Sequence, residues 1–114
     1  MSRNFALNLL LSVSLLASAP APATVLSSSG TVIQIVSYAE FGGGDVTFRL
    51  SNYPPGCGGG FWLSPNQLGF KTSVAQILAA RAKGQSLTVG GDNAQIWTGS
   101  ASPYCKVYWI VEED

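Results

Sequence analysis

Two cysteines place the strongest constraint on how this 114-residue chain can fold. Cys57 and Cys105 are the only cysteines, and the chain contains no histidine that would complete a zinc site with them. Two such thiols in an oxidising compartment form a disulfide. The sequence therefore predicts a Cys57–Cys105 bond, which ties a glycine-rich loop in the middle of the chain to its C-terminal part.

The N-terminal segment indicates export to such a compartment. Arg3 precedes an apolar run over residues 5–17, and small residues follow up to Ala23. The run is shorter than the about 20 residues of a membrane-spanning helix, so we expect residues 1–23 to be a signal peptide cut near Ala23, with a retained anchor as the alternative. A bacterial periplasmic or secreted location follows. The remaining 91 of the 114 residues suffice for one small domain.

Charge and composition disfavour several classes of function. Six basic residues balance six acidic ones, so no basic surface for nucleic acid is expected. The absence of histidine removes the usual general base and the commonest metal ligand. We therefore expect no enzyme activity, no metal site, no cofactor and no membrane insertion.

The first half of the expected domain is read as strands. Residues 24–30 are small and polar, which predicts a flexible leader, and the barrel domain is expected over residues 31–114. Residues 31–38 and 45–51 carry β-branched and alternating apolar residues, joined through three glycines as a hairpin. Residues 61–63 form a short third strand after the loop around Cys57.

One helix is predicted over residues 70–83, because the period of the apolar residues changes there. Ser73 and Gln76 have the spacing of a capping box, and Gly84 follows where a C-terminal cap is expected. The apolar face of this helix would carry Phe70, Val74, Ile77, Leu78 and Ala82.

Further strands are expected over residues 86–89, 95–98 and 104–113, with a turn at residues 90–93. Along the last strand the residues alternate between two faces, and both faces carry apolar groups, which predicts self-association. One face is expected to hold Cys105, Val107, Trp109 and Val111, and the other Tyr104, Lys106, Tyr108 and Ile110. The whole order predicts a mainly β fold, a small OB-like barrel of five to six strands with a single α-helix between strands three and four.

Four segments resemble a known family. They are Cys57 in its loop, GFWLSP at 60–65, AQILAARAKGQSLTV at 75–89 and YCKVYWI at 104–110. Here the chain resembles small secreted bacterial proteins that are similar to the subtilase cytotoxin B subunit, over residues 30–114. The resemblance implies an OB-like barrel closed by a disulfide; in the toxin group such subunits assemble as ring-shaped pentamers and bind glycans. No sugar-contacting residue is transferred, because fold analogy does not establish function.

The candidate ligand contacts are aromatic residues that lie in loops or on the opposite face of a strand from its apolar residues. Beside two of them, a short GSASP segment supplies hydroxyls. Core or interface packing is the alternative role for these rings. The expected ligand-binding residues are Trp97, Tyr104, Ser100, Ser102, Tyr53 and Tyr108.

Two hypotheses for function follow. The first is a non-catalytic secreted or periplasmic binding module, a glycan-binding homo-oligomer that resembles a toxin B subunit. The alternative is a periplasmic accessory or inhibitor protein that covers a protein partner through an exposed aromatic face. In both, the partner is a glycan or a protein and not a nucleic acid.

Overall fold

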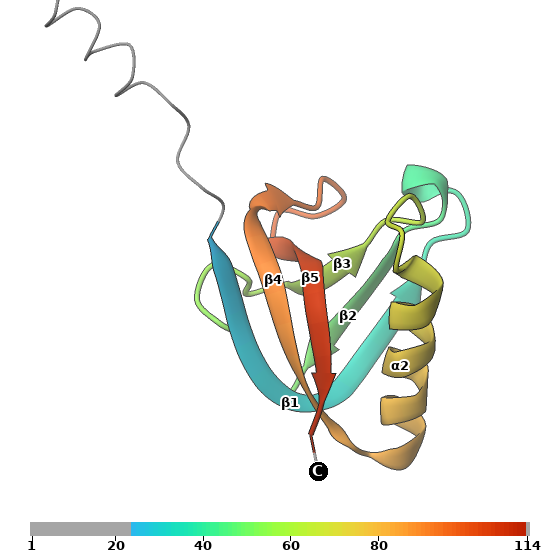
Figure 1. The fold of residues 1–114 in the computed structure, drawn as a ribbon. Helices are drawn as coiled ribbons and strands as arrows, with labels where there is room; N and C mark the ends of the chain where they lie inside the picture. Colours follow the sequence, from blue (N-terminus) through green and yellow to red (C-terminus); the bar gives the residue numbers. More distant parts are fainter. Residues whose placement is uncertain (1–23, 114) are drawn as a thin grey trace, which may run out of the picture.

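The structure is a computed structural model that describes residues 24–113. Within them, five strands and one α-helix follow one another, with a short 3-10 turn, η1, after the first strand (Figure 1). The elements are β1 Val25–Ser37, η1 Phe41–Gly43, β2 Val46–Leu50, β3 Gly60–Leu63, α2 Phe70–Lys83, β4 Ser86–Ile96 and β5 Tyr104–Glu112. The predicted signal peptide, residues 1–23, lies outside the described residues.

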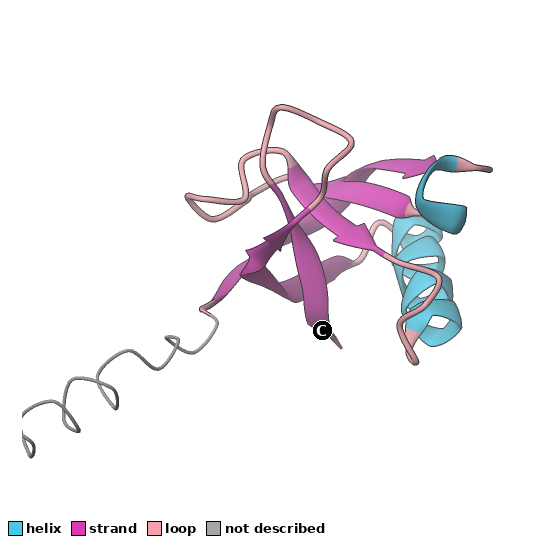
Figure 2. Ribbon diagram, turned by 90° about the horizontal axis from the view of Figure 1, so that it is seen from above, coloured by secondary structure: helices cyan, strands magenta, loops and turns pink. Residues whose placement is uncertain are grey.

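The strands close into a barrel in the order β1-β2-β3-β5-β4, with β4 returning to β1. Among the strand pairs within residues 24–113, only that of β3 and β5 is parallel. Helix α2 connects β3 to β4, packs against β1 and β4, and lies to one side of the strands in the view from above (Figure 2). The predicted fold class is confirmed: a mainly β, OB-like closed barrel of five strands with one α-helix between the third and fourth.

Strand β1 is long and curved, and both halves of the sheet share it (Figure 1). Val25 to Thr31 pair with β4, and Val32 to Ser37 pair with β2. The prediction of a flexible leader over residues 24–30 is therefore wrong from Val25 onward. These small, polar residues have little tendency to form a strand by themselves, and the backbone of β4 supplies the hydrogen-bond partners that order them.

Two aromatic rings and the disulfide form the centre of the core. Phe48 and Phe61 stack with centroids 5.6 Å apart, and both are fully buried. The Cys57–Cys105 disulfide is confirmed, with 5.4 Å between its Cα atoms. It joins the β2–β3 loop to the beginning of β5, so it links two parts of the barrel that are 48 residues apart in sequence.

The predicted helix over residues 70–83 is confirmed, but its contacts differ from the expected ones. Ile77 and Ala80 are its buried residues, whereas Leu78 is half exposed. Ser73 lies inside the first turn and its N–H donates to the Gly69 carbonyl, so the predicted capping box is wrong. Gly84 ends the helix as expected, with a left-handed φ of 65°.

Irregular pairing between β4 and β5 overturns two further expectations. Strand β4 runs continuously through the turn predicted at residues 90–93. In β5, Val107 pairs with Gly91 and Trp109 pairs with Gly90, so Tyr108 is an extra, bulged residue. The bulge changes which side chains face inward: Ile110 packs against the core, while Trp109 and Val111 are partly exposed. The predicted simple alternation along this strand is therefore wrong.

No helix within residues 24–113 is long and apolar enough to cross a membrane.

Candidate functional site

Three loops meet at one end of the barrel (Figure 1). They connect β1 to β2, β3 to α2, and β4 to β5. In OB-type barrels the β1–β2 and β4–β5 loops border the surface that binds ligands. The first of these loops turns through Gly42, Gly43 and Gly44, whose φ angles of 65°, 81° and 114° suit glycine. This tight turn leaves the neighbouring Phe41 ring 46% exposed.

Four aromatic rings gather at this end, and we call them the aromatic loop end: Tyr38, Phe41, Trp97 and Tyr104. Trp97 lies at the centre. Its ring centroid is 5.1 Å from that of Tyr38, 5.5 Å from Phe41 and 5.4 Å from Tyr104. Tilted and edge-to-face pairs at such distances are favourable, so the cluster joins the β1–β2 loop to the β4–β5 loop through aromatic contacts.

A buried hydrogen bond holds the centre of the cluster. Trp97 Nε1 donates to Asp45 Oδ2 at 2.9 Å, and both residues are only 4% exposed. A hydrogen bond to a buried carboxylate is stronger than one between neutral groups. Because Asp45 ends the β1–β2 loop and Trp97 begins the β4–β5 loop, this bond fixes one loop against the other.

Trp97 is therefore buried, and the prediction that it is an exposed stacking platform is wrong. Besides its aromatic neighbours, the backbone of Gly99 covers it: a Cβ placed on Gly99 would lie 2.4 Å from two atoms of the indole. The sequence could not show that the loop folds back over this ring. The role of Trp97 is to position the rings around it.

Tyr104 lies beside Trp97 and the GSASP segment, as predicted from the sequence. The residue is partly exposed, and its ring lies against the backbone of Gly59, where a Cβ would be 2.6 Å from Tyr104 Cδ1 and Cε1. Ser100 and Ser102 lie in the exposed loop beside it, and the Ser102 N–H donates to Ser100 Oγ at 3.1 Å. The structure thus brings Trp97, Tyr104 and this loop together.

Two of the predicted ligand residues lie outside the cluster. Tyr53 is half exposed in the β2–β3 loop. Tyr108 is 71% exposed at the bulge of β5, four residues and about 13 Å along the strand from Tyr104. Conversely, Tyr38 and Phe41 were not among the ligand residues predicted from the sequence. The only local signal is their position just before the run of three glycines, Gly42 to Gly44.

A polar face with two basic residues continues from Tyr104 across β3. The register places Gly60 beside Tyr104, and Trp62 beside Lys106. Lys106 Nζ lies 5.2 Å from the centroid of the Trp62 ring, within the range of a cation–π contact. On β2, Arg49 is partly exposed, and its buried Nε has no hydrogen-bond partner. This face adds positive charge next to the aromatic loop end.

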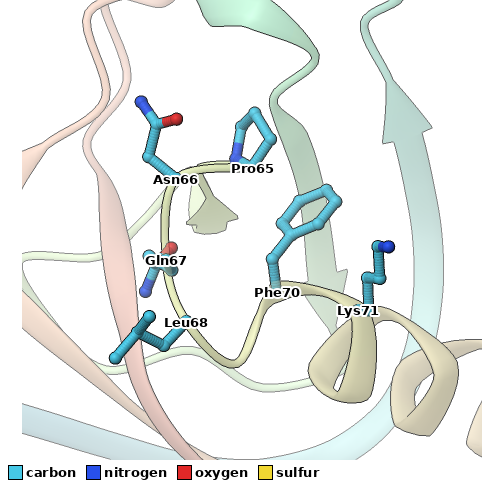
Figure 3. Close-up of a pocket in the computed structure, with 6 residues that line it drawn as sticks. All are labelled: Pro65, Asn66, Gln67, Leu68, Phe70 and Lys71. Carbon is cyan, nitrogen blue, oxygen red and sulfur yellow. The ribbon is translucent and has the colours of Figure 1, made fainter.

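A shallow pocket of about 520 Å³ lies in the β3–α2 loop (Figure 3). Gln67 fixes this loop, because its Nε2 donates to the Val107 carbonyl at 3.0 Å and its Oε1 accepts from the Ser64 N–H at 2.8 Å. Leu68 is fully exposed at the tip. The lining residues are Pro65, Asn66, Gln67, Leu68, Phe70 and Lys71. None of them is a carboxylate or carries a hydroxyl group.

Asp92 organises the bulged part of β4 below the β4–β5 loop. Its Oδ2 accepts from Gln95 Nε2 at 2.8 Å and its Oδ1 from the Ala94 N–H at 2.9 Å. The bond from Gln95, followed by that from Ala94, holds the pKa of Asp92 below its ordinary value of 3.8; Lys106 adds a smaller effect, and burial partly opposes it.

A lowered pKa makes the contribution of Asp92 to stability dependent on pH. The ionised form is favoured in the folded state, so the stabilisation is complete above the ordinary value of 3.8 and is lost as the pH falls through the folded pKa. We expect the free energy of unfolding of the wild type to exceed that of Asp92→Asn at neutral pH, and this difference to shrink when the pH is lowered below 3.8. Urea unfolding of both proteins at neutral pH and at a pH below 3.8 measures the difference. A difference that does not change with pH would contradict the lowered pKa of Asp92.

Comparisons with protein-family models, with curated proteins and with solved structures find no significant match to this chain.

Proposed function

We propose that this protein is an exported, non-catalytic binding module that engages its ligand through the aromatic loop end. One observation carries the proposal: the partly exposed rings of Phe41 and Tyr104 are held in place by a buried indole that is hydrogen-bonded to Asp45. Rings that are already immobilised lose little conformational entropy when a ligand packs on them. The Asp45 carboxylate beside this cluster serves to hold Trp97 in place.

A glycan is the ligand that fits this surface best. The apolar faces of sugar rings pack on aromatic side chains, and the hydroxyls and backbone groups of the β4–β5 loop next to Tyr104 supply hydrogen bonds. Lys106 and Arg49 lie on the adjoining face and add donors. The sequence segments that resemble small secreted bacterial proteins similar to a toxin B subunit led to the same expectation.

Removal of the Phe41 ring or the Tyr104 ring tests whether a glycan binds at the aromatic loop end. We expect Phe41→Ala and Tyr104→Ala each to weaken glycan binding at least about 10-fold, since central aromatic contacts are typical hot spots. Tyr53→Ala is the matched control, because this ring is exposed but lies outside the cluster. A glycan array with purified protein followed by calorimetry gives the affinities. Unchanged binding in both cluster variants, with unchanged thermal transitions, would refute the aromatic loop end as the site.

A protein partner is the second candidate, and Leu68 favours it. This fully exposed leucine adjoins Pro65 and Phe70 in the shallow pocket beside the β1–β2 loop. An apolar loop tip next to exposed rings is typical of a protein interface. Leu68→Ala should leave glycan binding unchanged, whereas it should weaken a complex with a periplasmic enzyme or envelope protein.

Export and self-association complete the proposal. The Cys57–Cys105 disulfide is what an oxidising compartment outside the cytoplasm permits. Tyr108 is 71% exposed at the bulge of β5 and provides aromatic surface for a homo-oligomer. Light scattering of the purified protein measures its oligomeric state directly.

A further inference from the structure

The outer face of β1, β4 and β5 carries an exposed tryptophan, Trp109, which is not part of the core. Trp109 pairs with Gly90 across the two strands. A Cβ placed on Gly90 would lie 2.4 Å from Trp109 Cε2 and 2.7 Å from its Nε1 and Cζ2. The indole therefore lies directly against the backbone of β4, in space that only glycine leaves free. The residue is 37% exposed, so part of its side chain faces solvent.

A chain of hydrogen-bonding groups lies next to this ring. The row of paired residues beside Trp109 contains Ser29, Thr88 and Val111. Thr88 Oγ1 donates to Glu113 Oε2 at 2.5 Å, and Ser29 Oγ is 2.5 Å from Thr88 Oγ1. Because the Thr88 proton is used on Glu113, the Ser29 hydroxyl is the donor in the second bond. The hydroxyl oxygens and the carboxylate are thereby fixed in position as acceptors.

The spacing and charge of these groups select one class of ligand. Neighbouring rows on one face of a sheet are two residues apart, about 7 Å, which is comparable to the width of a hexopyranose with its hydroxyls. Trp109 can pack on the apolar face of such a sugar ring, while the hydroxyls of the sugar donate to Thr88, Ser29 and Glu113. The only charge in this chain of groups is the Glu113 carboxylate, which disfavours anionic ligands and suits a neutral one.

We propose that Trp109, Ser29, Thr88 and Glu113 form a second binding site, which takes a neutral sugar in pyranose form. This site is independent of the aromatic loop end, because it lies on another surface and shares no residue with it. Trp109 supplies the stacking surface, and the hydroxyl and carboxylate groups select the orientation of the sugar.

Saturation-transfer NMR on the full purified protein tests the site, with neutral trisaccharides of glucose, galactose, mannose and N-acetylglucosamine as probes. We expect at least one probe to bind to the wild type. Trp109→Ala should weaken this binding at least about 10-fold. Thr88→Val removes one hydroxyl from a side chain of nearly the same shape and should weaken the binding several-fold. Tyr53→Ala is the matched control, since it removes an exposed ring that lies outside both sites and should leave this binding unchanged.

The remaining outcomes overturn the inference and separate it from the proposed function. If Phe41→Ala abolishes binding while Trp109→Ala and Thr88→Val do not, the sugar occupies the aromatic loop end and only the second site is refuted. If no neutral probe binds, the second site is refuted whatever the loop end recognises. If the wild type is a dimer that Trp109→Ala converts to a monomer without any sugar binding, this face is a contact between copies of the chain.

Discussion

Removal of the disulfide by the double variant Cys57→Ala/Cys105→Ala is expected to lower the free energy of unfolding by about 4 kcal/mol, according to the chain-entropy model. The two cysteines are 48 residues apart, so the bond closes a long loop in the unfolded chain and reduces its conformational entropy. Both side chains are fully buried. For a domain of this size the loss is a large fraction of the total stability. Urea unfolding monitored by circular dichroism gives the value.

The wild type treated with reductant is the control, because it breaks the same bond without changing a side chain. It should lose a similar amount of stability. A loss below about 1 kcal/mol in both samples would show that the unfolded state is already restricted without the bond, or that the bond strains the native state.

Replacement of a single ring in the core should have an effect of similar size. Phe48→Ala removes a fully buried side chain that stacks on Phe61, and it leaves a cavity that the closed barrel cannot easily fill. We expect the free energy of unfolding to fall by about 3 to 5 kcal/mol. Equilibrium unfolding in urea is again the measurement.

Phe41→Ala is the matched control, since it makes the same change at a ring that is 46% exposed in the β1–β2 loop. Its effect on stability should be well below that of Phe48→Ala, because less apolar area returns to water. Equal losses in the two variants would mean that the aromatic loop end contributes as much to stability as the core does, and would weaken its assignment as a binding surface.

Sequence alone determined the elements whose signals are local. The apolar alternation around Phe48 predicted β2, the change to a helical period predicted residues 70–83, and Gly84 predicted the end of that helix. Two cysteines without histidine predicted the disulfide. These features depend on periodicity, backbone conformation and redox chemistry, which neighbouring residues or a residue count already specify.

The candidate sites were only partly predictable, because they depend on which distant segments meet. Tyr104 and its loop were identified from composition, whereas the burial of Trp97 by Gly99 and Asp45 depends on how two loops fold against each other. Nothing near Phe41 in the sequence indicates that its ring contacts a residue more than fifty positions away.

Only the tertiary structure decided the path of β1 and the irregular pairing of β5. Val25 to Thr31 have little tendency to form a strand, yet they are ordered because β4 offers a line of unpaired backbone groups. The bulge at Tyr108 reverses the inward and outward positions after it and thereby places Trp109 on Gly90. Strand pairing is a non-local interaction, and one extra residue in the pairing moves every following side chain to the other face of the sheet.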